Sequence, residues 1–284
     1  MSRATISGEP DAFLIDLTKC TGCRGCMVAC KQWNQLPAEE TDFFSGEGYQ
    51  NPKEMSENTY TVIKFREFEK NGHSIFSFYK EMCMHCDDPA CVSVCPVNAF
   101  HKTPEGPVIY DAKVCIGCRF CMIGCPFDVP KYEWSKKLPL VRKCDGCYSR
   151  IKADLKPACV TACPSAMEYG PRSQMVQIAE ERLKRHPDHY INTIYGKDEA
   201  GGTSVLYLSS EPYEELRFPS VPERPLPSYT WPALRLVPGI FATVVTGLTA
   251  LTLFNHRKER LERERNKEKE AEQQRTVQAE EDKS

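Results

Sequence analysis

The sequence lacks a strong excess of either charge. Its 37 Lys and Arg residues nearly balance 39 Asp and Glu residues, which gives a formal net charge of -2. A basic surface that would attract nucleic acid is therefore not indicated, and we expect no nucleic-acid partner. The sequence also contains no Ser-His-Asp or Cys-His arrangement for nucleophilic catalysis and no phosphate-binding glycine loop. We therefore expect no catalytic site in this chain.

An export signal is missing from the first residues. Residues 1–11 are polar, with neither an apolar core nor a twin-arginine pair, so they do not match a secretory signal. If the chain is exported, we expect it to leave the cytoplasm already folded, together with a partner that carries the signal.

Isolated cysteines are also absent, because all sixteen fall into four groups of four. The first and third groups have the spacing C-x2-C-x2-C-x3-C, the second has C-x2-C-x4-C-x3-C, and the fourth has eleven residues before its third member. In chain order the groups are Cys20, Cys23, Cys26 and Cys30; Cys83, Cys86, Cys91 and Cys95; Cys115, Cys118, Cys121 and Cys125; and Cys144, Cys147, Cys159 and Cys163. The last three groups are followed by Pro96, Pro126 and Pro164, but the first is followed by Lys31.

This spacing is typical of bacterial ferredoxins, which hold cubane iron–sulfur clusters. Three closely spaced cysteines on a tight loop converge on one cluster. The fourth is expected on the opening turn of a helix and ligates the other cluster of a two-cluster unit. The proline redirects the chain and leaves neighbouring amides free to face sulfur, so we expect the helix at Lys31 to start differently. The four groups predict four 4Fe-4S clusters.

Two other chemistries use paired cysteines. Zinc sites combine two C-x2-C pairs per metal and need no fourth cysteine at a fixed distance before proline. Disulfide frameworks are typical of secreted chains under about a hundred residues, and cysteines so close in sequence rarely reach the geometry of a relaxed bridge. Both are disfavoured in a chain of 284 residues with this pattern.

Short strands are predicted around the cysteine groups by runs of β-branched and aromatic residues. They cover residues 12–17, 60–65, 74–79, 106–111 and 204–209, with a hairpin turn at Asn71-Gly72. Residues 173–185 have apolar residues at helical spacing, and Ser173 is the predicted N-cap. Because such units bury little apolar surface, we expect bound metal to supply part of the folding energy.

The C-terminal part has a different character. Residues 212–232 are rich in proline and are predicted to form an extended strap. Residues 236–254 contain no charged residue, and a helix of this length spans roughly 29 Å, about the thickness of the hydrocarbon core. We predict a transmembrane helix over residues 233–255. A charged tail, either a solvated helix or disordered, follows over residues 256–284.

The charge of the tail predicts the orientation of this helix. Residues 256–269 carry seven Lys or Arg residues against four acidic residues, so by the positive-inside rule the tail is cytoplasmic. The cluster domain then lies on the periplasmic, outer face of the cytoplasmic (inner) membrane.

Several stretches resemble a known family. They are residues 20–35 (CTGCRGCMVACKQWNQ), 51–65 (NPKEMSENTYTVIKF), 83–96 (CMHCDDPACVSVCP), 115–132 (CIGCRFCMIGCPFDVPKY) and 201–208 (GGTSVLYL). With the single C-terminal span, they resemble the iron–sulfur (beta) subunits of molybdopterin oxidoreductases. The likeness is closest to the subunit of membrane-bound respiratory formate dehydrogenase.

The resemblance implies an α+β fold of tandem two-cluster ferredoxin-like units, with added strands and loops and one C-terminal transmembrane helix. A four-cluster domain would cover residues 1–211. Its inner unit would span about residues 80–130, and its outer unit would combine about residues 12–35 and 140–170.

The resemblance also implies that cluster ligation crosses over within each unit. The four ligand sets would be Cys20, Cys23, Cys26 and Cys163; Cys144, Cys147, Cys159 and Cys30; Cys83, Cys86, Cys91 and Cys125; and Cys115, Cys118, Cys121 and Cys95. Basic residues beside the ligands are candidates for tuning the cluster potentials. They are Lys19, Arg24, Lys31, Arg119, Arg142 and Lys143. His85 lies between two cysteines of the second group but is not expected to be a ligand.

The implied function is electron relay, one electron at a time, through four 4Fe-4S clusters. Electrons would pass from a molybdenum or tungsten pterin catalytic subunit of formate dehydrogenase to a membrane cytochrome b or quinone-reducing subunit.

Two alternative functions stay open. The second and third groups and residues 194–208 are as similar to the four-cluster subunit of membrane-bound nickel–iron hydrogenases, whose members usually carry an export signal. The other alternative is a self-standing membrane-anchored polyferredoxin.

Overall fold

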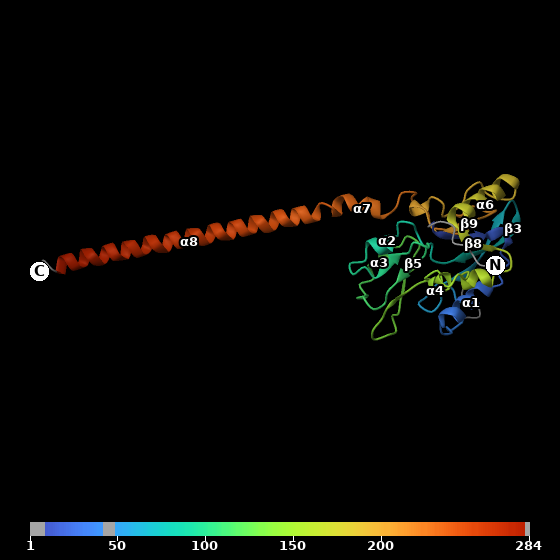
Figure 1. The fold of residues 1–284 in the computed structure, drawn as a ribbon, viewed down its shortest axis with the longest axis horizontal. Helices are drawn as coiled ribbons and strands as arrows, with labels where there is room; N and C mark the ends of the chain where they lie inside the picture. The colour runs from blue at the N-terminus through green and yellow to red at the C-terminus, as the bar shows by residue number, and fades with distance from the viewer. Residues whose placement is uncertain (1–8, 42–48, 282–284) are drawn as a thin grey trace. The chain divides into compact units, whose positions relative to one another are not determined.

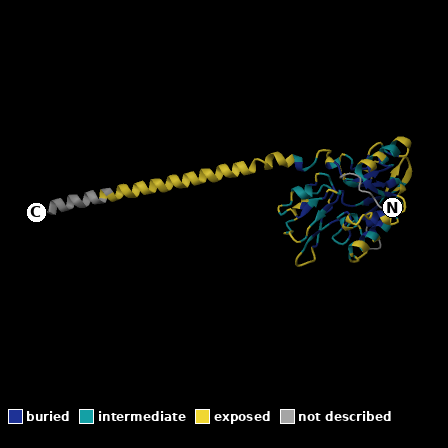
Figure 2. Cartoon of the chain, in the orientation of Figure 1, coloured by how far each residue is buried: buried dark blue, intermediate teal, exposed yellow. Residues whose placement is uncertain are grey.

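The computed structural model describes residues 9–41 and 49–281, and for residues 268 and 270–281 it describes the backbone alone. Residues 1–8, which make up most of the segment predicted to lack an export signal, and residues 282–284 of the predicted tail lie outside the described residues. The chain divides into two compact units, Met1–Tyr229 and Thr230–Ser284. The buried residues gather in the first unit (Figure 2).

A three-stranded sheet lies in the first unit (Figure 1). Its central strand, β1 (Asp11–Asp16), pairs antiparallel with β8 (Met167–Pro171) and parallel with β9 (Val205–Leu208). β1 leads into the first cysteine group through a 3-10 turn, η1 (Leu17–Lys19), and β8 begins shortly after the last group. The pairing of β1 with β8 therefore brings the two ends of the cysteine series together.

The residues of β1 alternate between the two faces of this sheet, as the period of a strand requires. Ala12 and Leu14 join the cluster formed with Met175 of α6 (Arg172–Arg185). Phe13 and Ile15 belong to the larger core, which also contains several of the cysteines. One face thus packs on a helix and the other faces the cysteine groups.

The predicted hairpin is confirmed, with strands longer than expected. β2 (Val62–Lys70) and β3 (His73–Glu81) pair antiparallel. Asn71 and Gly72 join them with positive φ angles of 53° and 76°, the conformation that an Asn-Gly turn favours.

Two small hairpins and a second 3-10 turn complete the strands and turns. The predicted strand near residue 108 is β5 (Val108–Tyr110), and its partner β4 (Phe100–Lys102) was not predicted. The remaining elements are β6 (Lys131–Tyr132), β7 (Val141–Arg142) and η2 (Glu199–Gly201).

Each cysteine group has a helix that contains its third cysteine. These helices are α1 (Gly25–Asn34), α2 (Ala90–Ser93), α3 (Phe120–Gly124) and α5 (Ala158–Thr161), and α4 (Tyr148–Lys152) lies within the long insertion of the fourth group. The expectation that the fourth cysteine opens a helix is wrong. In three groups that cysteine follows the end of the helix, and only Cys30 lies inside one.

The residue after the fourth cysteine explains this difference. Pro96, Pro126 and Pro164 cannot continue a helix, because proline lacks the backbone N–H and its ring clashes with the preceding turn. Lys31 has neither restriction, and α1 runs on to Asn34. The first group therefore differs in where its helix ends, not in where it starts.

The predicted N-cap of α6 is also wrong. The helix begins at Arg172, and Ser173 lies in its first turn. Both the backbone N–H and the hydroxyl of Ser173 donate to the carboxylate of Glu9, each at 2.8 Å. A carboxylate from a distant segment thus satisfies the helix start.

The C-terminal segment is more helical than predicted. Part of the expected strap forms α7 (Pro227–Leu234), which contains Pro232. α8 (Val237–Glu281) then continues through the apolar run and most of the charged tail. The stretch Pro227–Lys267 is long and apolar enough to cross a membrane, with a mean hydropathy of 1.9 in its most apolar window. The α+β fold with one long apolar C-terminal helix is confirmed.

Candidate iron–sulfur sites

Four cysteines line a first cavity beside η1 and the start of α1. Cys20, Cys23 and Cys26 come from the first group, and Cys163 comes from the last. The empty space among the lining residues, including its opening, is about 410 Å³. The β1–β8 pairing brings Cys163 to this loop, because Cys20 follows the sheet by way of η1 and Cys163 precedes β8.

A second cavity of about 310 Å³ is lined by Cys30, Cys144, Cys147 and Cys159. Cys26 and Cys30 stand four residues apart on α1 and therefore lie on the same helix face, one turn apart. Helix α1 thus borders both cavities. Phe13 of β1 and Asp145 complete part of the lining of the second cavity.

The two inner cysteine groups also approach each other. Burial, and then the negative charges of Cys83, Cys125 and Cys91, raise the pKa of Cys86 well above its usual value. Burial and the charges of Cys115 and Cys118, with a smaller contribution from Cys95, raise the pKa of Cys121 to about 11. Cys125 therefore lies near the first three cysteines of the second group, and Cys95 lies near Cys121 of the third.

The donor set fits an iron–sulfur cube better than a single ion. Among the described residues, no three or more His, Cys, Asp or Glu side chains are placed to hold one metal ion, whereas each of the two cavities is surrounded by four sulfurs. Burial is the main cause that raises the pKa of Cys30 to about 11 and that of Cys147 to about 12. Burial disfavours the charged form of these groups, and cluster iron would supply the positive charge that stabilises them as thiolates.

Amide groups are directed at several of the sulfurs. Donor-to-sulfur distances are 3.4 Å for Gly117 N to Cys115, 3.3 Å for Gly146 N to Cys144, 3.1 Å for Ala99 N to Cys95, 3.3 Å for Ala166 N to Cys163 and 3.6 Å for Asn34 Nδ2 to Cys30. Such donors stabilise thiolate charge and set cluster potentials. At Cys30 the donor is a side chain, because the backbone there remains in the helix.

A buried lysine that the sequence did not reveal lies between the two outer cavities. Lys80 lines both of them and is only 2% exposed. Although burial opposes its charge, the thiolate groups around it, led by Cys159 and Cys26, raise the pKa of Lys80 above its usual value. The one sequence feature that could have indicated its place near the cysteines is its position on β3, three residues before Cys83.

Lys143, one of the predicted tuning residues, connects the outer and inner groups. Its ammonium donates to the backbone carbonyls of Val108 and Cys144, the latter at 2.8 Å. Burial again opposes its charge, but the groups of Cys83, Cys91 and Cys144 raise the pKa of Lys143.

The other predicted tuning residues differ in position. Lys19 and Arg24 line the first cavity. Lys31 forms an ion pair with Glu39 at 3.1 Å, and Arg142 forms one with Glu133 at 2.8 Å. Arg119 stacks over the rings of Tyr132 and Trp134, with its guanidinium carbon 5.5 and 5.1 Å from their centroids.

His85 occupies a position that is glycine in the other three cysteine loops. Gly22, Gly117 and Gly146 have φ angles of 66°, 69° and 70°, and His85 has a φ of 50°. The left-handed region is costly for most residues other than glycine, although histidine is among those that enter it more often. The side chain at this position is therefore expected to have a specific role.

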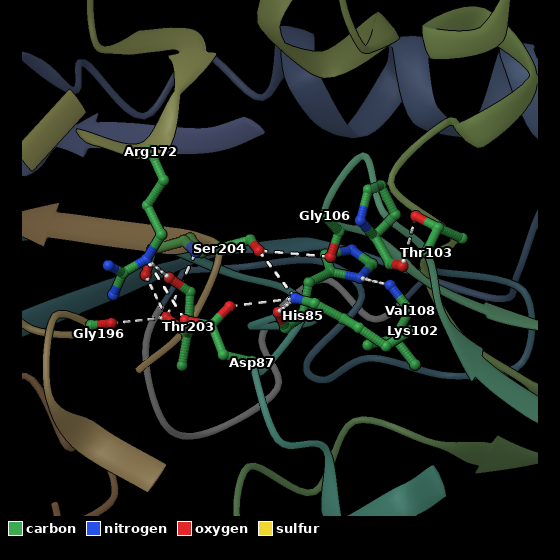
Figure 3. Close-up of polar contacts among 12 residues, drawn as sticks. His85, Asp87, Lys102, Thr103, Gly106, Val108, Arg172, Gly196, Thr203 and Ser204 are labelled. Carbon is green, nitrogen blue, oxygen red and sulfur yellow. Dashed lines mark hydrogen bonds and ion pairs between the residues drawn. The ribbon is translucent and has the colours of Figure 1, made fainter. Parts of the chain in front are cut away.

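The surroundings of His85 hold its ring and its backbone (Figure 3). The Val108 N–H donates to Nδ1 at 3.0 Å, and Lys102 Nζ donates to the His85 carbonyl at 2.8 Å. Burial and the positive charges of Lys143 and Lys102 hold the pKa of His85 well below its usual value. The imidazole is therefore neutral, and it fixes the second cysteine loop against β5.

The α+β fold and the cysteine-lined cavities define a multi-cluster, ferredoxin-like iron–sulfur protein. Two family models, each described as a 4Fe-4S dicluster domain, match residues 19–99 and 75–172. Together they cover all four cysteine groups, which is consistent with four clusters.

Curated relatives narrow the class. The chain is 38% identical to a protein of Nitratidesulfovibrio vulgaris, over 88% of this chain and 70% of that protein. It is 37% identical to the iron-sulfur subunit of the nitrate-inducible formate dehydrogenase of Escherichia coli K12, over 69% and 67%. It is 34% identical to the hydrogenase-2 operon protein HybA of Escherichia coli O157:H7, over 74% and 73%. The chain belongs to the family of four-cluster iron–sulfur electron-transfer subunits of respiratory oxidoreductases.

Proposed function

We propose that this chain is the electron-transfer subunit of a membrane-bound formate dehydrogenase. When bound, its four 4Fe-4S clusters would each accept and pass on one electron. The chain would connect a molybdenum or tungsten pterin catalytic subunit with a membrane cytochrome b or quinone-reducing subunit. Similarity to formate dehydrogenase iron-sulfur subunits along more than two thirds of the chain supports this proposal.

The proposed ligand sets of the outer unit are Cys20, Cys23, Cys26 and Cys163, and Cys30, Cys144, Cys147 and Cys159. The single observation that supports these two ligand sets is that the four cysteines of each set line one cavity. The proposed inner sets are Cys83, Cys86, Cys91 and Cys125, and Cys115, Cys118, Cys121 and Cys95. The mutual influence of these cysteines on their pKa values supports them.

The residues around the cavities would hold the clusters and keep water from them. Lys80 would place positive charge beside the two outer sites. Lys143 would place positive charge between the outer and inner cysteine groups. Positive charge and N–H donors near sulfur favour the reduced form of a cluster and raise its potential. Lys19 and Arg24 would act on the first cavity alone.

The apolar part of the C-terminal helix would anchor the subunit in the cytoplasmic membrane. Its apolar composition and the basic residues that follow support a periplasmic cluster domain and a cytoplasmic tail. This orientation requires export, which we propose occurs in complex with a partner that carries the signal.

A second candidate is the corresponding subunit of a membrane-bound nickel–iron hydrogenase. The observation that favours it is the match to HybA, which extends over 244 residues against 201 for the nitrate-inducible formate dehydrogenase subunit. A self-standing polyferredoxin is the remaining possibility.

Anaerobic purification of the chain from its native membranes tests all three. A copurifying large subunit with molybdenum or tungsten, and clusters that are reduced by formate, would support the proposal. A nickel-containing partner and reduction by hydrogen would replace it with the hydrogenase. Purification of the chain without a large subunit would favour the polyferredoxin.

A further inference from the structure

One buried cation faces both cavities of the outer unit. Residues Phe76, Phe78 and Lys80 of β3 lie on one face of the hairpin, because side chains alternate along a strand. Phe78 covers the first cysteine loop, since a Cβ at Gly22 would lie 2.9 Å from its ring. Lys80 is the next residue on this face and lines both cavities.

The ammonium of Lys80 has few protein partners for a charge so deeply buried. Among the described residues, Thr61 Oγ1 is its hydrogen-bond acceptor, and no Asp or Glu forms an ion pair with it. Buried charges in proteins are normally paired, and an ammonium can donate three hydrogen bonds. Within residues 9–41 and 49–281, therefore, no carboxylate supplies its counter-charge.

The neighbouring lysines of the same region show the ordinary solution. Lys64, on the partner strand β2, is also buried, but it lies 3.3 Å from Glu81 and donates to the carbonyl of Lys53. Lys102 forms an ion pair with Asp87 at 3.2 Å. Lys80 differs from both because sulfur ligands surround it in place of a carboxylate.

We infer that Lys80 is a shared counter-ion and hydrogen-bond donor for the two clusters of the outer unit. It is a positioning residue that raises the reduction potentials of both clusters together, since one fixed charge stabilises added electrons at either site. The inference rests on the proposed ligand sets of the outer unit.

Three variants of the full-length protein, purified in its complex, separate the parts of this role. Lys80→Met removes the charge and the donor at similar length, whereas Lys80→Gln removes the charge and keeps an N–H donor. Lys64→Met is the matched control, because it removes a buried lysine of the same hairpin whose counter-charge is Glu81. Iron content and anaerobic redox titration followed by electron paramagnetic resonance (EPR) are the measurements.

We expect the potentials of two of the four clusters to fall in Lys80→Met and to fall less in Lys80→Gln. All four should stay unchanged in Lys64→Met. Two shifted clusters would support a charge shared by one pair. Unchanged potentials in both Lys80 variants, or an equal shift of all four clusters, would overturn the inference.

Iron content decides the case in which a Lys80 variant assembles poorly. Loss confined to two clusters, with the other two retained, supports a counter-ion role at the outer sites, whereas loss of all four contradicts it.

Failure of the proposed ligand sets would give a different result from failure of the Lys80 inference. Fewer than about sixteen irons in the unmodified protein would overturn the ligand sets and the Lys80 inference together. About sixteen irons with unshifted potentials would overturn only the role of Lys80.

Discussion

Cys20 and Cys163 line the same cavity, although they belong to the first and last cysteine groups of the chain. The sheet explains this proximity. β1 delivers the chain to Cys20, and β8 carries it away from Cys163 in the antiparallel neighbour strand. The outer unit is therefore closed by strand pairing, and its two cavities each combine cysteines from both ends of the series.

This crossover predicts which variants share a defect. We expect Cys163→Ala and Cys20→Ala to lose the same EPR signal, because both residues line the first cavity. Cys159→Ala should lose a different signal, since Cys159 lines the second cavity. Each variant should lose about a quarter of the iron. Loss of the same signal in Cys163→Ala and Cys159→Ala would refute the crossover.

Much of this arrangement could be predicted from local patterns. The cysteine spacing predicted the clusters, and the Asn-Gly turn predicted the β2–β3 hairpin. Features that depend on distant partners could not be predicted. Glu9 satisfies the start of α6 in place of Ser173, and β4 was missed because three residues give almost no periodicity.

The burial of Lys80 was the most consequential feature that the sequence hid. A lysine at the end of a strand is ordinarily exposed, and its position three residues before Cys83 is too weak a signal to reverse that expectation. Only the three-dimensional approach of the hairpin to both outer cysteine loops makes it internal. The predicted positions of the helices beside the cysteine groups were wrong for a different reason. The cysteine spacing alone does not say whether the third or the fourth cysteine lies on the helix.

The backbone of the Cys144–Cys147 loop makes a second prediction. Gly146 has a φ of 70°, and a Cβ there would lie 2.8 Å from Pro107. Gly146→Ala therefore adds an overlap to the cost of a left-handed alanine. Gly72→Ala is the control, because Gly72 has a φ of 76° with open space around it.

We expect Gly72→Ala to cost about 1–2 kcal/mol of stability and Gly146→Ala about 1–3 kcal/mol more. Anaerobic thermal unfolding of the holoprotein measures the difference. Equal melting temperatures for the two variants would show that Pro107 can move aside without cost.

His85 provides a third prediction. Its Nδ1 accepts from the Val108 N–H while its backbone is left-handed. Asparagine tolerates this backbone and carries an acceptor close to the position of Nδ1, so His85→Asn should lower stability by about 1 kcal/mol or less. His85→Val leaves the Val108 N–H unpaired and places a β-branched residue at positive φ, which should cost about 2–5 kcal/mol.

Thermal unfolding of both His85 variants, with iron content measured in parallel, checks this order of stability. Equal destabilisation by asparagine and valine would mean that the ring fills space and that its acceptor contributes nothing.

The charge distribution around the C-terminal helix makes a fourth prediction, about orientation. An epitope tag after Ser284 should be inaccessible to antibody in intact spheroplasts and become accessible after detergent treatment, because by the positive-inside rule the basic residues of 256–269 would keep the tail in the cytoplasm. Replacing Arg257, Lys258 and Arg260 by Gln removes three of the seven basic residues in this stretch. That variant should show a larger fraction of tag exposed on the outer surface.

A matched change of Glu259, Glu262 and Glu264 to Gln leaves the basic residues in place and should keep the tag inside, since acidic residues contribute little to topology. A tag exposed in the unmodified protein would reverse the orientation and place the cluster domain in the cytoplasm.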